Sequence, residues 1–133
     1  MAVETLNIEA LKALPDNAPV TMLNLLRLRE RGAEDSESGW ETYRRYSEVT
    51  VPMIKERGGT ILWAGRIEAI ALGIPADEGW DFAALVQYPS RRAFLDMMAS
   101  EAYLSEANPL RERAVTKHVI LAARALYSKF GDA

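Results

Sequence analysis

Residues 80–110 constrain the fold most strongly, because they read as a buried strand that stops at a proline and leads directly into a capped helix. Residues 80–88 are mostly apolar or aromatic, which is typical of a strand packed inside a sheet. Pro89 cannot donate a hydrogen bond to a neighbouring strand, and Ser90 is a residue type that favours the position just before a helix. The stretch therefore predicts one half of an α+β domain.

The length and composition predict one globular domain. At 133 residues the chain can bury about two-thirds of the surface that its unfolded form exposes. Apolar residues at 49% and charged residues at 26% are ordinary values for a globular protein. We divide the chain into an N-terminal helix and linker over residues 1–18, a core over 19–127 and a frayed tail over 128–133.

Charge and cysteine content narrow the possible partners. A net charge of −3 argues against nucleic acid, because phosphate binding needs a basic face. The short basic clusters at 26–31 and 111–117 are interrupted by Glu, and we interpret both as solvated surface. Cysteine is absent, which excludes disulfides and thiolate metal sites. No stretch approaches the ~20 apolar residues of a membrane span, and the first residues lack a secretory pattern, so we expect a soluble, cytoplasmic protein without a membrane partner.

Local patterns predict the other elements of the chain. Apolar runs bounded by turn residues indicate strands over 20–28, 60–72, 80–88 and 118–127. Helices are expected after Asn7, over 40–57 and after Ser90, followed by a helical segment over 100–115 that Asn108-Pro109 interrupts. Ser38 and Glu41 have the spacing of a capping box, which marks the start of the longest helix.

The order strand, helix, strand, strand, helix, strand predicts a four-stranded antiparallel sheet with the first and third strands at its centre and both helices on one face. Alternation along the strands then separates two faces. One set is wholly apolar and comprises Ile61, Trp63, Gly65, Ile67, Trp80, Phe82, Ala84, Val86, Tyr88, Val119, Leu121 and Ala123. The other set mixes apolar residues with Arg66, Asp81, Gln87, His118 and Arg124.

A second sheet face without helices is the basis for predicting a homodimer. Four strands of about seven residues make a face on the order of 400 Å² in projection. Left bare, such a patch would be large for a monomer. We therefore predict that this face meets its symmetry mate in a homodimer.

A set of residues distributed over 19–122 resembles the longer members of the DUF1330 family. The set comprises Asn24-Leu25-Leu26, Tyr43-Arg44-Arg45-Tyr46, Gly58-Gly59, Trp63, Gly65-Arg66, Trp80-Asp81, Tyr88-Pro89-Ser90-Arg91, Phe94, Met97, Tyr103 and Arg111. The resemblance implies a ferredoxin-like α+β fold that pairs as a dimeric α+β barrel. That superfamily also holds cofactor-free monooxygenases, haem-degrading enzymes, decarboxylases and stress-response dimers. No reaction follows from the fold alone.

His118 and Asn24 are two of the polar candidates for chemistry. His118 is the only histidine, and hence the only side chain whose ordinary pKa lies near neutrality. It is either a polar residue at a strand edge, exposed or paired with a carboxylate, or a proton-handling group. Asn24 lies in an apolar strand, where a buried amide needs a hydrogen-bond partner. It either ties a neighbouring strand or loop, or points into a ligand pocket.

Asp81 is the third candidate, because it is an acid in a strand expected to be buried. Its natural partner is Arg66 on the adjacent strand. The pair is either a structural ion pair or part of a ligand site. No set of residues has the spacing expected of metal ligands. The acidic run Glu34-Asp35-Ser36-Glu37 is interpreted as a solvated loop.

Two classes of function remain open. The first is a homodimer that binds a small apolar or aromatic molecule without turnover, using the residues Asn24, Tyr43, Tyr46, Trp63, Arg66, Trp80 and Asp81. The same aromatic residues can instead be ordinary core. The second is a cofactor-independent enzyme, monooxygenase- or isomerase-like, with Asn24, Asp81 or His118 as catalytic groups. Neither class is expected to carry a cofactor or a metal.

Overall fold

A computed structural model describes residues 6–30, 37–73 and 79–130 of the chain. Its strands are β1 (Val20–Leu28), β2 (Thr60–Arg66), β3 (Phe82–Tyr88) and β4 (Val115–Ala123). Its helices are α1 (Ile8–Lys12), α2 (Gly39–Glu56), α3 (Arg91–Ala99) and α4 (Asn108–Ala114), with one π-helical turn, η1 (Tyr103–Ala107), between the last two.

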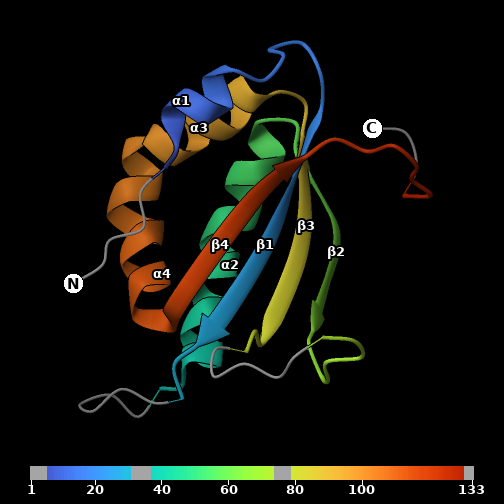
Figure 1. Cartoon of the computed structure of the whole chain (residues 1–133). Helices are drawn as coiled ribbons and strands as arrows, with labels where there is room; N and C mark the ends of the chain where they lie inside the picture. The colour runs from blue at the N-terminus through green and yellow to red at the C-terminus, as the bar shows by residue number, and fades with distance from the viewer. Residues whose placement is uncertain (1–5, 31–36, 74–78, 131–133) are drawn as a thin grey trace.

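The four strands form one antiparallel sheet in the order β2-β3-β1-β4. As predicted, the first and third strands lie at its centre. The helices of the described residues lie behind the sheet or along its β4 side, so in this part of the chain one sheet face carries no helix (Figure 1). The expected order of elements and the expected α+β layers are therefore both observed.

Strand pairing shifts the ends of three predicted strands. β2 ends at Arg66 rather than near residue 72, because its partner β3 begins at the opposite residue, Phe82. β3 accordingly starts two residues later than predicted. β4 runs from Val115 to Ala123 instead of 118–127, because β1 pairs with it only as far as Thr21 opposite Ala123. The ends of the strands depend on where a partner strand exists.

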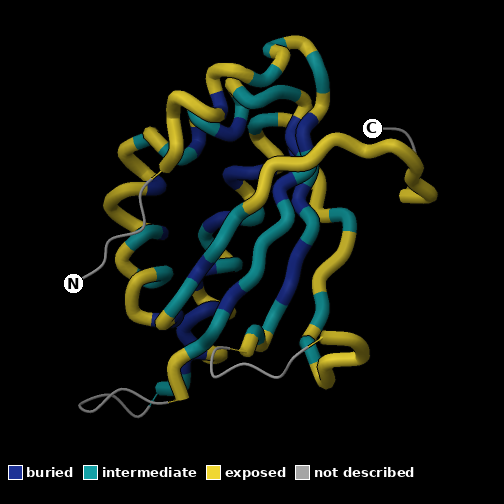
Figure 2. The backbone as a smooth tube through the Cα atoms, viewed as in Figure 1, coloured by how far each residue is buried: buried dark blue, intermediate teal, exposed yellow. Residues whose placement is uncertain are grey.

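The core lies between the covered face of the sheet and the helices, along the dark segments of Figure 2. Helix α2 begins with the predicted capping box: the Ser38 backbone N–H donates to Glu41 Oε1 at 2.8 Å, and the Glu41 N–H donates to Ser38 Oγ at 3.1 Å. The helix buries Tyr43 and Tyr46 against the sheet. The cap thus fixes where the aromatic face of α2 begins.

The predicted grouping of strand residues by face is wrong for β4. Phe82, Ala84, Val86 and Tyr88 face the helices, as their burial and pocket contacts show. On β4, however, His118 pairs with the fully buried Leu26 and therefore points to the helices, which turns Val119 and Leu121 to the open face. Single-strand alternation cannot show which set faces the helices.

The alternation along β2 is broken by an irregularity. Ile61 pairs with Val86, but Trp63 pairs with the next residue on β3, Leu85. One extra residue on β2 therefore turns Trp63 to the open face while Ile61 and Ala64 stay on the helix side. The prediction that Ile61 and Trp63 share one face is wrong for this reason.

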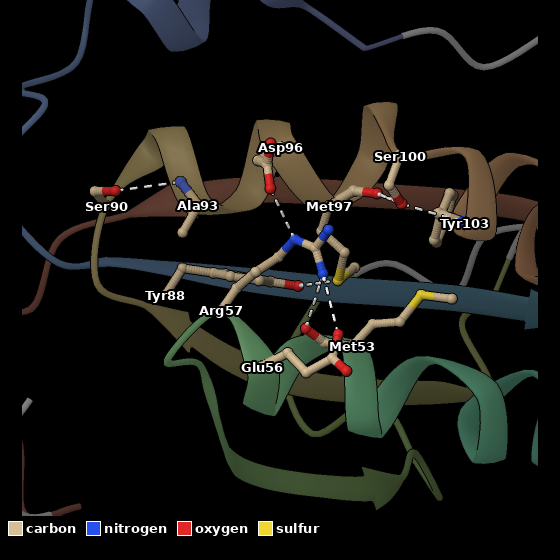
Figure 3. A network of polar contacts seen from close by, with 10 residues as sticks. All are labelled: Met53, Glu56, Arg57, Tyr88, Ser90, Ala93, Asp96, Met97, Ser100 and Tyr103. Atoms are coloured by element: carbon tan, nitrogen blue, oxygen red, sulfur yellow. Dashed lines mark hydrogen bonds and ion pairs between the residues drawn. The ribbon is translucent and has the colours of Figure 1, made fainter.

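The end of α2 is joined to α3 by an arginine (Figure 3). Arg57 Nε donates to Asp96 Oδ2 at 3.1 Å, and its Nη1 donates to the Met53 carbonyl at 3.4 Å. Nearby, Tyr88 donates from its hydroxyl to Met97 Sδ at 3.9 Å. These contacts tie the end of α2 to α3, and α3 to the end of β3.

Buried phenols make the stability of this core sensitive to alkaline pH. Burial raises the pKa of Tyr43 to about 12, and it also raises the pKa values of Tyr46, Tyr88 and Tyr103. An unfolded tyrosine has a pKa near 10. The contribution of Tyr43 is therefore complete below about pH 10 and is lost as the pH rises toward about 12.

We expect the free energy of unfolding to fall between about pH 10 and 12, by up to ~1.4 kcal/mol per pH unit for each buried phenol. Urea unfolding at pH 9, 10 and 11 measures this slope. Tyr43→Phe should reduce this slope, because it removes one buried phenol. Equal stability at pH 9 and pH 11 would contradict the prediction.

Candidate functional site

A pocket of about 570 Å³ lies beside β4. Helix α1 forms one wall, α3, η1 and α4 form a second, and β4 with part of β1 forms the floor. Its apolar lining residues are Leu6, Ala10, Leu11, Leu14, Met22, Phe94, Met98, Leu104, Ile120, Leu121 and Ala122. Its polar lining residues are Asn7, Tyr103, Asn108, Arg111, Glu112 and His118.

A chain of hydrogen bonds runs from Arg111 through His118 to Asn24. Arg111 Nη1 lies 3.2 Å from His118 Nδ1, and His118 Nε2 lies 3.0 Å from Asn24 Oδ1. Asn24 Nδ2 then donates to the Met22 carbonyl at 3.2 Å. Because a guanidinium can only donate, Nδ1 must accept, and Nε2 then carries the ring proton. The contacts thus describe a neutral His118 with both ring nitrogens bonded.

The register of β1 and β4 explains how the two polar side chains meet. Asn24 pairs with Ile120 and His118 pairs with Leu26, so both side chains point to the helix side as diagonal neighbours. His118 is only 7% exposed. Sequence reasoning allowed it to be an exposed strand-edge residue or to pair with a carboxylate. Instead it is buried and bonds to an amide and a guanidinium.

Arg111 reaches this site because no loop separates α4 from β4. The helix ends at Ala114 and the strand starts at Val115, so the last turn of α4 stands over the start of β4. Asn108 Oδ1 accepts a hydrogen bond from Arg111 Nε at 3.1 Å, which orients the guanidinium. The interpretation of the basic cluster at 111–117 as solvated surface is therefore wrong for Arg111. Its spacing of three from Asn108 on one helix was the available signal.

One phenol, Tyr103, lines the polar end of the pocket, and it is bonded to a second, Tyr46. The Tyr46 and Tyr103 hydroxyls lie 2.9 Å apart, and their rings meet edge to face. Burial raises the pKa of Tyr103, while its hydrogen bond to Tyr46 and the Arg111 guanidinium act in the opposite direction. Tyr103 therefore remains a neutral hydroxyl at physiological pH. None of the sequence arguments identified it as a site residue.

A smaller pocket of about 100 Å³ lies between α2 and the sheet. Asn24, Tyr43 and Tyr46 line it, together with Met22, Ile120 and other apolar residues of the core. Asn24 contacts this smaller pocket and His118 contacts the larger one. The hydrogen bond between them therefore forms part of the partition between the two spaces.

The other predicted site residues lie elsewhere. Asp81 is exposed, and its Oδ2 accepts a hydrogen bond from the Leu28 backbone N–H at 2.8 Å. Arg66 lies over the Trp40 ring, 5.6 Å from its centroid, so the predicted Asp81–Arg66 pair is wrong. The carboxylate thus bonds to the last residue of β1, beside the start of β3.

Two predicted aromatic residues are also separated from the pockets. Lys117 Nζ lies 5.2 Å from the Trp80 ring centroid, at the far end of β4 from the tail. Trp63 is 47% exposed on the open sheet face. Of the seven predicted ligand-binding residues, only Asn24, Tyr43 and Tyr46 line a common pocket.

Across residues 6–30, 37–73 and 79–130, no group of three or more His, Cys, Asp or Glu side chains is placed to hold a metal ion. In the same part of the chain, no helix is both long and apolar enough to cross a bilayer. Glu34 and Asp35, interpreted above as part of a solvated loop, lie outside the described residues.

Comparison with solved structures supports the fold. A protein of unknown function from Rhodopseudomonas palustris is 32% identical, with a TM-score of 0.81 over 95% of this chain and 97% of that one. A dimeric protein of unknown function with a ferredoxin-like fold from Bacteroides fragilis is 11% identical, with a TM-score of 0.53 over 84% of this chain and 100% of that one.

A dabb family protein with a ferredoxin-like fold from Mesorhizobium loti is also 11% identical, with a TM-score of 0.53 over 82% of this chain and 98% of that one. These likenesses confirm the predicted ferredoxin-like α+β fold. No curated protein matches the chain. Residues 38–125 match the profile of a family described as a domain of unknown function, DUF1330. Because that match spans more than half of its length, the chain belongs to the DUF1330 family.

Proposed function

We propose that the protein binds a small, mainly apolar molecule in the pocket of about 570 Å³ beside β4. This pocket is the observation that carries the proposal. Its volume lies within the range of about 300–1,000 Å³ that is usual for small-molecule sites. Its walls are mostly aliphatic, and apart from Asn7 beside α1 the polar groups lie on α4, η1 and His118. Such a division fits an apolar body with one polar end.

The polar end defines the kind of group that the ligand presents there. Arg111 offers only donors, and the Tyr103 hydroxyl lies on the same side of the pocket. A carboxylate or carbonyl oxygen is the complementary acceptor, because charge-assisted bonds from a guanidinium to an oxygen are the strongest of this kind. The ligand class is therefore an apolar or aromatic molecule that ends in an acceptor oxygen.

Catalysis without a cofactor is the second candidate. One observation favours it: a single neutral histidine, His118, is held in a fixed orientation at the pocket wall. Three others weigh against it. Both ring nitrogens are already bonded, and the cavity beside Asn24 is only about 100 Å³. Asp81 is satisfied by the backbone of β1. Binding without turnover is the simpler account of this geometry.

We also propose that the binding unit is a homodimer. The open sheet face carries large apolar side chains, namely Leu23, Leu25, Trp63, Leu85, Val119 and Leu121. Trp63 and Leu121 are each about half exposed in the single chain. A contiguous apolar patch of this kind marks an association surface. The structurally similar protein from Bacteroides fragilis is described as dimeric.

The ligand proposal is tested with paired probes, namely aromatic carboxylic acids and their neutral amides. A probe at 100 times its dissociation constant should raise the melting temperature by roughly 10 °C. Arg111→Met should greatly reduce the shift caused by the acids and reduce that of the amides less. Arg113→Met, on the same helix but 53% exposed at its side chain, is the matched control.

Ala122→Phe, which fills the pocket from β4, should abolish both shifts. Equal shifts in wild type and Arg111→Met would show that the guanidinium does not contact the probe. The absence of any shift across the probe set at millimolar concentration would contradict the proposed ligand class.

Removing the acceptor of His118 should destabilise the protein. Asn24→Ala leaves the buried His118 Nε2–H without its partner, which costs about 1–3 kcal/mol in free energy of unfolding. Urea unfolding at neutral pH measures this cost. Asn17→Ala, at an exposed turn, should change the stability by less than about 0.5 kcal/mol. An Asn24→Ala protein as stable as wild type would show that the bond between the side chains is not formed.

The homodimer is tested by sedimentation at micromolar concentration, where the mass should be twice the 14.8 kDa of one chain. Leu85→Lys places a charge at the centre of the open face and should give a monomer that remains folded. Glu48→Lys, on the exposed side of α2, should remain dimeric. A wild-type mass near that of one chain would refute the dimer.

A further inference from the structure

We propose that residues 124–130, which we call the C-terminal arm, bind the open sheet face of a second copy of this chain. The proposal rests on the homodimer proposed above and assigns a function to a segment that the sequence predicted to be part strand and part frayed tail. The arm begins where β4 loses its partner, since Ala123 pairs with Thr21 near the start of β1.

The arm carries three large apolar side chains that its own chain leaves exposed. All seven of its residues are exposed (Figure 2). Leu126 is 99% exposed, Tyr127 78% and Phe130 51%. A single exposed apolar side chain is ordinary, whereas three within five residues of an unsupported segment form a surface that lacks its partner. The hydrogen bond from the Phe130 N–H to Ser128 Oγ, at 3.1 Å, lies within the arm itself.

The position of the arm in the fold indicates that it binds a second copy of the chain. It leaves the sheet at the end of β4 and extends away from the helices, past the opposite side of the sheet (Figure 1). It therefore cannot fill the pocket beside α1 in its own chain. In a two-fold dimer that joins the open faces, the end of β4 lies at the rim of the interface. An arm at that rim reaches the partner's sheet, and the symmetry repeats the contact.

The arm adds to the area buried at the dimer interface and so contributes to the affinity of the dimer. The open sheet face measures on the order of 400 Å² in projection. A stable interface buries about 800 Å² on each partner. An aromatic side chain can bury about 150–250 Å², so Tyr127 and Phe130 together with Leu126 add a substantial apolar area to that of the sheet face. The arm therefore enlarges the interface that the sheet face makes.

A triple variant tests the arm without touching the fold or the pocket. We expect Leu126→Ser, Tyr127→Ser and Phe130→Ser together to raise the dimer dissociation constant at least tenfold in a sedimentation dilution series. Circular dichroism and melting of the monomer should be unchanged, because these side chains lie outside the core. Ser128→Ala with Lys129→Ala, in the same arm, should leave the dissociation constant unchanged.

A photo-crosslinking residue placed at position 127 provides a second readout. The expected product has twice the mass of the chain and joins the arm to peptides of β1 or β3 of the other copy. Unchanged dimer affinity in the triple variant, or crosslinks confined to one chain, would overturn the proposed role of the arm. Neither result would contradict the homodimer itself. A wild-type protein that is monomeric at micromolar concentration would overturn both. The two proposals therefore fail in distinguishable ways.

Discussion

The structure depends on the register in which β1 pairs with β3 on one side and β4 on the other. Side chains alternate along a strand, so one register decides what faces the helices. Here Leu26 opposite His118 and Asn24 opposite Ile120 place two polar groups in the core. The same register turns Leu23, Leu25 and their neighbours to the open face. A shift by one residue would exchange the two sets.

Burying an amide and an imidazole on the core side is costly unless each finds a partner. Asn24 and His118 satisfy each other, and Arg111 satisfies the second ring nitrogen. The result is a polar partition between two pockets rather than a continuous apolar core. Because α4 supplies Arg111, the partition also links the last helix to the sheet. The proposed ligand site therefore lies where the core is least uniformly apolar.

The two faces of the sheet have different roles in the proposed assembly. The covered face holds the pockets and the buried phenols, whose raised pKa values make the fold sensitive to alkaline pH. The open face and the arm carry apolar residues that a single chain leaves exposed. Association through one face leaves the pocket on the other face accessible to a ligand. Binding and dimerisation can therefore be tested with separate variants.

Short-range patterns in the sequence determined the order of the elements and the class of the fold. The strand that stops at Pro89, the cap at Ser90 and the capping box of Ser38 and Glu41 all depend on residues within one turn of each other. These strand and helix ends could therefore be predicted without knowing how the rest of the chain folds. The sequence also singled out Asn24 and His118 as polar residues in apolar surroundings that needed partners.

Only the tertiary structure determined which residues are the hydrogen-bond partners of Asn24 and His118. The irregularity in β2, the length of β4 and the position of Arg111 over His118 depend on residues far apart in the chain. Asp81 was predicted to be buried from its neighbours, yet it is exposed, and its carboxylate accepts a hydrogen bond from the Leu28 N–H at the end of β1. Local patterns specify which segments form strands and helices. The pairing of those segments, set by packing across the whole core, specifies which side chains meet.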